Sequence, residues 1–268
     1  MQIFIGFLAG AFIAVIAWRA DSLSISGAIA AAVSGGLIFG IGGLPWAALL
    51  LIFFITSSVL SKAFKGRKAK LGEKFAKGSQ RDWAQVLAND GVGTLLVLFL
   101  LLDPDQTWAW LAYAGAMATV NADTWATELG VLNPKPPRLI TNGRVVEVGT
   151  SGGISLLGTL ATLGGAALVG LVGAAFSLGA GAWTLMLAVT LGGVCGSLFD
   201  SLLGATVQAI YHCPACVKET ERHPSHTCGT ETTQIRGWRW LALRNDLVNF
   251  LASAVGAIVS AGLWLGLQ

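Results

Sequence analysis

An uncharged stretch of the sequence, residues 24–61, reads SISGAIAAAVSGGLIFGIGGLPWAALLLIFFITSSVLS. A transmembrane helix needs about 20 predominantly apolar residues, so this stretch is long enough for two. The whole chain of 268 residues is 54% hydrophobic and 12% charged, and it contains 35 glycines. No water-soluble domain of this length needs so much apolar sequence. The composition therefore predicts a polytopic membrane protein.

The apolar stretches lack the ten-residue alternation of a transmembrane barrel, so they favour helices. We predict an all-α fold, a helical bundle that forms a single transmembrane domain over residues 1–268. The N-terminus has no basic leader, and we expect it to be the first span rather than a signal peptide. The eight expected spans are residues 2–18, 24–43, 45–63, 84–102, 106–124, 153–176, 183–205 and 245–266.

The basic residues follow the expected spans closely. The loops after the first, third, fifth and seventh spans hold one, eight, three and five of the 17 Lys and Arg residues, and the other loops hold none. By the positive-inside rule, both termini lie outside, and the loops near residues 64–83, 130–152 and 206–244 lie in the cytoplasm. The positive charge therefore gives no reason to expect nucleic acid as a partner. The basic loop 62–81 is expected to be a topology anchor, with contact to anionic headgroups as the alternative.

Small residues recur four positions apart in the first spans, as in Gly6 to Gly10 and Gly36 to Gly40. This spacing lets helix backbones approach closely. We expect these residues to pack within the chain, and a homodimer contact is the alternative. Short similarities between spans one to four and spans five to eight also suggest a parallel four-helix repeat.

Polar residues gather where several expected spans meet the cytoplasm. The fifth span ends in Asn121-Ala-Asp-Thr-Trp-Ala-Thr-Glu-Leu-Gly130, which carries two carboxylates. Similar groups occur in Asn89-Asp90, in Ser197-Leu-Phe-Asp200-Ser201 and in Asn245-Asp246-Leu-Val-Asn249. Charges this deep in apolar sequence are costly and by default mark a functional site.

These acidic side chains come from different spans but share one membrane boundary, so we expect a common site. Carboxylates cannot share a small volume unless cations neutralise them. Carboxylates, amides and hydroxyls are hard oxygen ligands suited to Mg²⁺, which takes phosphate oxygens as further ligands. The expected catalytic residues and Mg²⁺ ligands are Asp123, Glu128, Asp200 and Asp246.

A segment rich in glycine and hydroxyl groups, Gly149-Thr-Ser-Gly-Gly-Ile-Ser155, precedes the sixth span. Free backbone N–H groups at such a helix start bind phosphate well, although no Walker loop is present. Cations in the preceding loop are placed to meet anions. The residues expected to bind nucleotide or phosphate are Asn89, Asp90, Asn121, Thr124, Lys135, Arg138, Arg144, Thr150, Ser151, Gly152, Gly153, Ser155, Ser197, Ser201, Asn245 and Asn249.

The last long loop contains Cys213-Pro-Ala-Cys216 and His226-Thr-Cys228. Cys-x-x-Cys followed by His-x-Cys supplies four soft ligands for a tetrahedral structural zinc ion. A cytoplasmic position argues against disulfides. Free thiols in a polar loop are the alternative to zinc.

Four motifs together resemble an integral-membrane family that includes the phytyl-phosphate kinase of tocopherol synthesis. They are Asn121-x-Asp-Thr-x-x-x-Glu-Leu-Gly130, Gly149-Thr-x-Gly-Gly-x-Ser155, Gly196-Ser-x-x-Asp-Ser-x-Leu-Gly204 and Asn245-Asp-x-x-Asn249. The resemblance implies a kinase, and the pattern of basic residues places its site at the cytoplasmic face of the cell membrane. Its substrates would be a nucleoside triphosphate, with CTP as one candidate, and an isoprenyl monophosphate such as phytyl phosphate, which becomes the diphosphate.

Two other functions fit the same residues. A cytidylyltransferase that forms a CDP-activated lipid would also use Mg²⁺, but it would release pyrophosphate. A membrane transporter would give flux across liposomes without nucleotide turnover, although its charges would more usually lie near the midplane. If the polar helix ends form no common site, replacement of Asp123 and Asp200 by alanine would leave activity intact.

Overall fold

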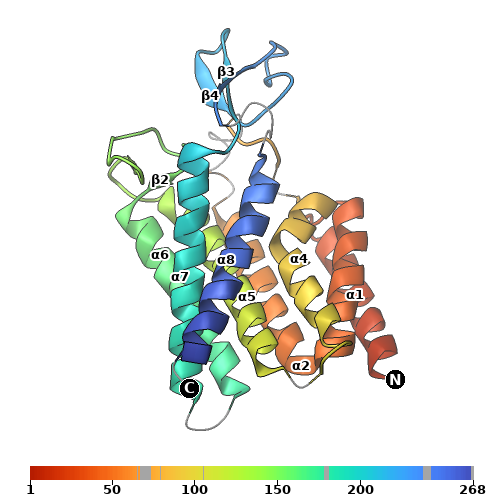
Figure 1. The fold of residues 1–268 in the computed structure, drawn as a ribbon. Coiled ribbons are helices and arrows are strands. Elements are labelled where there is room, and N and C mark those ends of the chain that lie inside the picture. The colour runs from red at the N-terminus through yellow and green to blue at the C-terminus, as the bar shows by residue number, and fades with distance from the viewer. Residues whose placement is uncertain are drawn as a thin grey trace.

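The structure, a computed structural model, describes residues 1–64, 66, 74–78, 80–104, 106–177, 181–237 and 243–266. Its helices pack side by side in one bundle (Figure 1). They are α1 (Gln2–Arg19), α2 (Ile25–Ala63), α4 (Trp83–Phe99), α5 (Thr107–Gly130), α6 (Leu156–Ala175), α7 (Ala182–Thr206) and α8 (Asn245–Gly266). The predicted all-α membrane fold is confirmed. Among the described residues, five helices are long and apolar enough to cross a membrane: α1, α2, α6, α7 and α8.

Helix α2 consists of two helical halves that meet at Gly43. Gly43 adopts φ 80° and ψ −166°, which glycine enters far more easily than other residues. Pro45 follows, at the start of the second half, where its missing N–H costs little. A Cβ on Gly35 would touch Leu50, although the two would be about four turns apart in a straight helix. The halves therefore fold back on each other, as the predicted boundary between residues 24–43 and 45–63 requires.

With α2 divided at Gly43, the described residues form eight helical segments that match the eight predicted spans in order. The largest difference is in α5, which continues to Gly130 rather than ending near residue 124. That extension places Glu128 on the same helix as Asp123. The crossing of the membrane by each segment, and the four-helix repeat, stay predictions.

Helix α1 packs tightly on the first half of α2 through glycine. A Cβ on Gly6 would approach the backbone of Gly36 and Gly40 to 2.6–2.8 Å, which is too close for a real side chain. The expected packing role of these small residues is confirmed. Near the break in α2, the side-chain amide of Gln2 donates a hydrogen bond of 3.3 Å to the carbonyl of Phe39. This bond satisfies a backbone acceptor that the bilayer could not.

Helix α5 is the centre of the bundle. All residues from Leu111 to Ala122 are buried, and the helix contacts α6, α7 and α8. Small residues permit the close approach, because a Cβ on Gly256 of α8 would overlap the hydroxyl of Thr119 and would lie 2.9 Å from the carbonyl of Gly115. The polar end of α5 is thereby held at a fixed place between its neighbours.

Short strands lie at one end of the bundle, and both termini lie at the other (Figure 1). β1 (Arg138–Leu139) pairs with β2 (Gly153–Ile154) in an antiparallel ladder. β3 (Ile210–Cys213), β4 (Lys218–Thr220) and β5 (Thr233–Arg236) form an antiparallel sheet in the order β4-β3-β5. The sequence predicts no strands here, because runs this short in polar loops lack a clear period.

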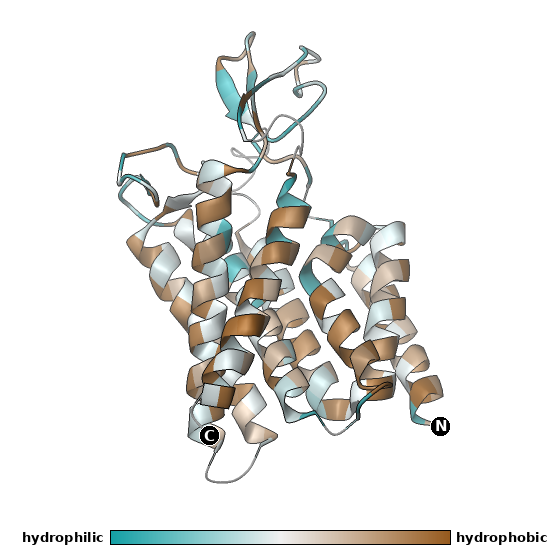
Figure 2. Ribbon diagram, viewed as in Figure 1, coloured by the Kyte–Doolittle hydropathy of each residue, from teal (hydrophilic) through white to brown (hydrophobic). Residues whose placement is uncertain are grey.

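The strand end of the molecule is also its hydrophilic end (Figure 2). The three predicted cytoplasmic loops meet there. The backbone N–H of Glu221 donates to the carbonyl of Lys74 at 2.7 Å, and the ammonium of Lys74 binds the carboxylate of Glu147 at 2.7 Å. The assignment of this end to the cytoplasm stays a prediction from the pattern of basic residues.

The packing at α5 predicts the effect of enlarging Gly256. We expect Gly256→Val to lower stability by about 1–3 kcal/mol or more, because the new side chain must displace Thr119 and the backbone of two helices. Gly262→Val is the control on the same helix, since nothing lies within 4 Å of a Cβ there. Thermal unfolding in detergent measures both. Equal melting temperatures for the two variants would contradict the packing described.

Candidate functional site at the polar end of the bundle

A cavity of about 760 Å³ opens among the helix ends and the loops that cover them. Helices α4, α5, α6, α7 and α8 all contribute to its walls, as do residues 149–155 and 221–225. The cavity is lined by the following residues of the predicted site: Asn89, Asp123, Thr124, Glu128, Thr150, Ser151, Gly152, Gly153, Ser155, Ser197, Asp200, Ser201, Asn245, Asp246 and Asn249. All four carboxylates expected to bind Mg²⁺ are among them.

Asp200 is the least satisfied carboxylate of the cavity. It lies on α7, in the face that the spacing of Ser197, Asp200 and Ser201 predicted. Its Oδ2 atom is buried and has no hydrogen-bond partner in the part of the chain that the structure describes. Asp200 also interacts electrostatically with Asp123 on α5 and with Glu221. Like charges at this depth are unfavourable unless a cation joins them.

Glu128 is positioned by the preceding helix and loop. Its side chain is buried, and Oε1 accepts a hydrogen bond of 2.6 Å from the hydroxyl of Ser61. The guanidinium of Arg81 interacts with the charge of Glu128. The same guanidinium lies 5.5 Å from the ring centroid of Phe53 and 5.9 Å from that of Phe54. These contacts fix a cation on the cavity wall.

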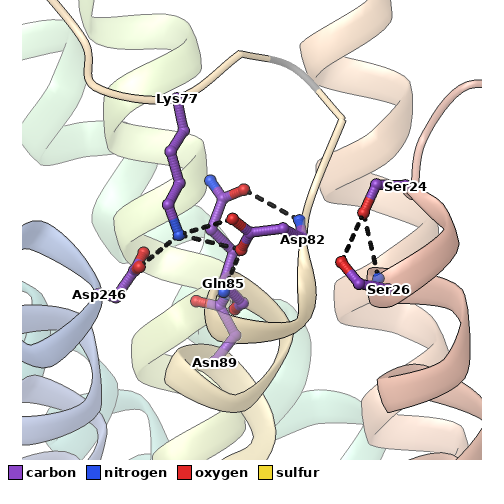
Figure 3. A network of polar contacts seen from close by, with 8 residues as sticks. Ser24, Ser26, Lys77, Asp82, Gln85, Asn89 and Asp246 are labelled. Carbon is purple, nitrogen blue, oxygen red and sulfur yellow. Dashed lines mark hydrogen bonds and ion pairs between the residues drawn. The ribbon is translucent and has the colours of Figure 1, made fainter.

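Lys77 joins the ends of α4 and α8 (Figure 3). Its ammonium lies 2.9 Å from the carboxylate of Asp82 and also binds Asp246. Asp82 caps α4, and its partner Gln85 completes a capping box. Partial burial lowers the pKa of Lys77, but its hydrogen bonds to Asp246 and Asp82 outweigh that effect, so the pKa is raised. Lys77 is therefore a cation at neutral pH and partly neutralises the acidic cavity.

Residues 149–155 form one wall of the cavity. Gly149 and Gly152 have φ of 82° and 81°, and a Cβ on Gly152 would lie 2.5 Å from Ala205, so the turn fits α7 only with glycine. The hydroxyl of Ser151 donates to the side-chain oxygen of Gln208 at 2.6 Å, which links this wall to the segment after α7.

The start of α6 has fewer free N–H groups than we expected. Ser155 is its N-cap, and the Ser155 hydroxyl accepts from the N–H of Gly158 at 3.1 Å. The side-chain oxygen of Asn133 accepts from the N–H of Leu157 at 3.4 Å. These caps are not apparent from the sequence, because a serine before a helix serves as a cap as readily as a ligand. The hydroxyl of Thr150, which lines the cavity, is a better candidate for a phosphate contact than this helix end.

Two predicted site residues lie elsewhere and hold the bundle together. Asp90 does not line the cavity; its carboxylate accepts a hydrogen bond from Ser34 on α2. Asn121 is fully buried. It accepts from the hydroxyl of Thr56 at 2.9 Å and donates to the carbonyl of Gly165 at 2.8 Å, which links α5 to α2 and α6. Asp90 and Asn121 each lie on a different face of their helix from the cavity residues, so their side chains point to a neighbouring helix.

The three predicted anion-binding cations also lie outside the cavity. Lys135, Arg138 and Arg144 are exposed in the loop after α5. Arg138 donates to the carbonyl of Gly143 at 2.9 Å, within its own hairpin. Arg138 lies on β1, and in the pairing of β1 with β2 its side chain is exposed rather than part of the cavity lining.

Other cations, which the sequence pattern did not single out, take that place. Lys77, Arg81, Arg222 and Arg244 line the cavity. The first two belong to the basic loop 62–81, for which we expected a topology anchor or contact with anionic headgroups.

Glu221 is a further cavity residue that the sequence did not reveal. Its carboxylate accepts from the side chain of Gln208 at 2.9 Å and from the N–H of Ala76 at 3.4 Å. Burial raises its pKa, and the charge of Asp246 adds to this, although the two hydrogen bonds act in the opposite direction. No periodicity marked it, because it follows a short strand.

The family of the chain can be stated from comparison with known proteins. Residues 8–257 match the family described as Integral membrane protein DUF92. The chain belongs to this family. The family resemblance drawn from the four sequence motifs is confirmed, and the chain is a multi-pass membrane protein.

Its relatives are spread widely among organisms. Protein PGR of Arabidopsis thaliana is 38% identical over 221 residues, which cover 73% of this chain and 75% of the relative. An uncharacterised membrane protein of Methanocaldococcus jannaschii is 35% identical over 76% of this chain and 83% of its own length. Another from Synechocystis is 26% identical over 83% of this chain and 78% of its own. No solved structure matches the chain.

The position of Asp200 predicts that it destabilises the protein when no cation is bound. We expect Asp200→Asn to raise the melting temperature in EDTA by roughly 2–4 °C, because it removes a carboxyl group whose ionisation is opposed by Asp123 and Glu221 and whose buried Oδ2 has no hydrogen-bond partner among the described residues. Mg²⁺ should stabilise the native sequence and leave the variant unaffected.

Asp103→Asn is the matched control, since Asp103 lies beyond the other end of α4 and accepts a hydrogen bond from Gln106. It should leave the melting temperature in EDTA and the gain with Mg²⁺ unchanged. If Asp200→Asn kept the full gain with Mg²⁺, Asp200 would not be a cation ligand.

Proposed function

We propose that the protein catalyses Mg²⁺-dependent phosphoryl transfer from a nucleoside triphosphate to an isoprenyl monophosphate. The observation that carries this proposal is the convergence of Asp123, Glu128, Asp200 and Asp246 with residues 149–155 on one cavity at the end of a membrane bundle. Phosphoryl transfer needs little beyond positioning and charge neutralisation, and this cavity offers donors for both.

The donor set fits a divalent cation. Asp123 and Asp200 interact across the cavity from α5 and α7, and the buried Oδ2 of Asp200 has no hydrogen-bond partner among the described residues. Both are hard oxygen donors, beside the hydroxyls of Ser197 and Ser201. Asp123 and Asp200 are therefore the first ligands we assign. When held by these residues, Mg²⁺ would supply positive charge that offsets the negative charge of the phosphate groups.

Asp246 and Glu128 have a second role in the proposal. In the structure, each already interacts with a cation, Asp246 with Lys77 and Glu128 with Arg81. They hold these cations at the cavity wall, where Lys77 and Arg81 can contact the triphosphate. Arg222 and Arg244, which also line the cavity, supply further positive charge. The hydroxyl of Thr150, which lines the cavity, is placed to donate to phosphate oxygens.

The reaction requires no strong base. An oxygen of the acceptor monophosphate is already ionised, and it attacks the terminal phosphorus of the triphosphate. The bond from that phosphorus to the bridging oxygen breaks, and the nucleoside diphosphate leaves with the electron pair. The cationic side chains at the wall stabilise the negative charge on the transferred group.

The isoprenyl nature of the acceptor rests on the motifs shared with the phytyl-phosphate kinase family. A lipid phosphate suits this cavity because the cavity lies where apolar helices end and polar loops begin (Figure 2). The headgroup would enter among the charged residues while the tail stays in the bilayer. CTP is one candidate donor on the same resemblance.

A transfer assay tests the proposal. Purified protein is incubated with Mg²⁺, several γ-labelled nucleoside triphosphates, and phytyl, farnesyl or geranylgeranyl monophosphate. We expect the label in an isoprenyl diphosphate, with release of a nucleoside diphosphate. No transfer to any acceptor would overturn the proposal. Release of pyrophosphate, with the α-phosphate in the lipid product, would favour the cytidylyltransferase instead.

Variants of the assigned ligands test whether the polar helix ends form one functional site or serve unrelated roles. Asp123→Asn and Asp200→Asn should each reduce the rate of transfer by about 10²–10³-fold while the protein remains folded. Asp103→Asn should retain the native rate, because its carboxylate lies outside the cavity. Native rates in both ligand variants would remove these carboxylates from the reaction.

A further inference from the structure

Four metal-ligating side chains meet above the cavity, in the segment that carries β3 and β4. The ligand atoms of Cys213, Cys216, His226 and Cys228 all lie within 4.8 Å of one another. We propose that they bind a structural zinc ion, and that this ion holds residues 217–225 against the mouth of the cavity. The inference requires none of the chemistry proposed for the cavity itself.

Two tight turns present the ligands in pairs. In the first, the N–H of Val217 donates to the carbonyl of Cys213 at 2.9 Å, which places Cys213 and Cys216 on one side. In the second, the N–H of Gly229 donates to the carbonyl of His226 at 2.9 Å, and Gly229 has a φ of 82°. Paired ligands on short turns are typical of structural zinc sites, in which all four positions are filled by protein.

The distances agree with tetrahedral coordination. Cys213 Sγ and Cys228 Sγ are 3.5 Å apart, and Cys228 Sγ is 3.5 Å from Nδ1 of His226. Two sulfur atoms that each lie roughly 2.3 Å from one tetrahedral zinc are separated by roughly 3.8 Å. A disulfide would require about 2.05 Å. The cysteines are free thiols, so they remain available as ligands.

His226 supplies an independent observation. Its side chain is only 4% exposed, which is unusual for a histidine in a loop of polar residues. Nε2 is buried and has no hydrogen-bond partner within the described residues, and the contacts of Nδ1 are long, at 3.5 Å. The protein thus gives the buried ring no strong partner. A metal ion bound to Nδ1, the nitrogen that lies beside Cys228 Sγ, explains why the ring is buried with only long contacts at Nδ1.

The proposed ion brackets a segment that lines the cavity. Cys213 and Cys216 precede residues 217–225, and His226 and Cys228 follow them. Within the segment, Glu221 and Arg222 line the cavity. The N–H of Glu221 donates to the carbonyl of Lys74 at 2.7 Å, so the segment also supports the loop that carries Lys77. Zinc would hold the two ends of residues 217–225 in place. Through the bond to Lys74, it would also hold the loop that carries Lys77.

Metal analysis of the full-length protein tests the site. Protein purified without added metal should contain close to one zinc ion per chain by mass spectrometry of its elements. Cys213→Ser combined with Cys228→Ser should lose it. Cys195→Ser is the matched control, because Cys195 lies on α7 away from the cluster, and it should keep the zinc. A metal-free native protein that takes up no zinc, iron in place of zinc, or a disulfide between Cys213 and Cys228 would each overturn the proposal.

Hydrogen exchange tests the positioning role without a variant that could misfold. Chelation of zinc from the native protein should increase exchange at least tenfold in residues 217–225, and added zinc should restore protection. Exchange in the buried part of α5 should not change. If chelation removed zinc but left exchange of this segment unchanged, the ion would not hold it against the cavity. Neither measurement depends on nucleotide or lipid, so failure here is distinct from failure of the transfer assay.

Discussion

The half-buried carboxylates on α5 and α7 are the constraint on which the polar end of this molecule depends. Asp123 and Asp200 interact at the end of two apolar helices, where charge is poorly solvated. Glycine packing holds these two helices close together, since a Cβ on Gly193 of α7 would lie 2.7 Å from the Cβ of Ala118 on α5. The packing that stabilises the bundle therefore also places the two carboxylates near each other.

The surrounding residues reduce that cost only in part. Lys77 neutralises Asp246, and Arg81 acts on Glu128, but neither reaches the buried oxygen of Asp200 in a hydrogen bond. A folded protein keeps such a residue when it has a task, because its replacement would otherwise improve stability. We propose that the task of these donors is to bind a cation together with a phosphate. The cation would offset the negative charge of the carboxylates, and the phosphate would supply further oxygen ligands to the cation. The cavity is thus better suited to a cation–phosphate complex than to either ion alone.

The sequence predicted the helices well, because apolar length and the distribution of basic residues are strong signals. It also selected Asp123, Asp200 and Asp246, since each lies near the predicted end of a helix. It did not distinguish Asn121, which faces a neighbouring helix, because one-dimensional spacing does not give the angle of a side chain around the bundle. Lys77 and Arg81 were missed since their place depends on how a loop folds over helix ends, which only tertiary structure defines. For the same reason, the sequence indicated the exposed cations of loop 130–152 as the anion-binding residues instead.

Coupled binding of cation and phosphate is the central claim, and calorimetry measures it directly. The affinity for Mg²⁺ is determined with and without a triphosphate analogue whose terminal bridging oxygen is replaced by nitrogen, so that no turnover occurs. Binding linkage requires each ligand to strengthen the other by the same factor. After correction for their association in solution, we predict at least a tenfold mutual gain for the native protein. Equal Mg²⁺ affinities with and without the analogue would contradict a shared cation–phosphate site.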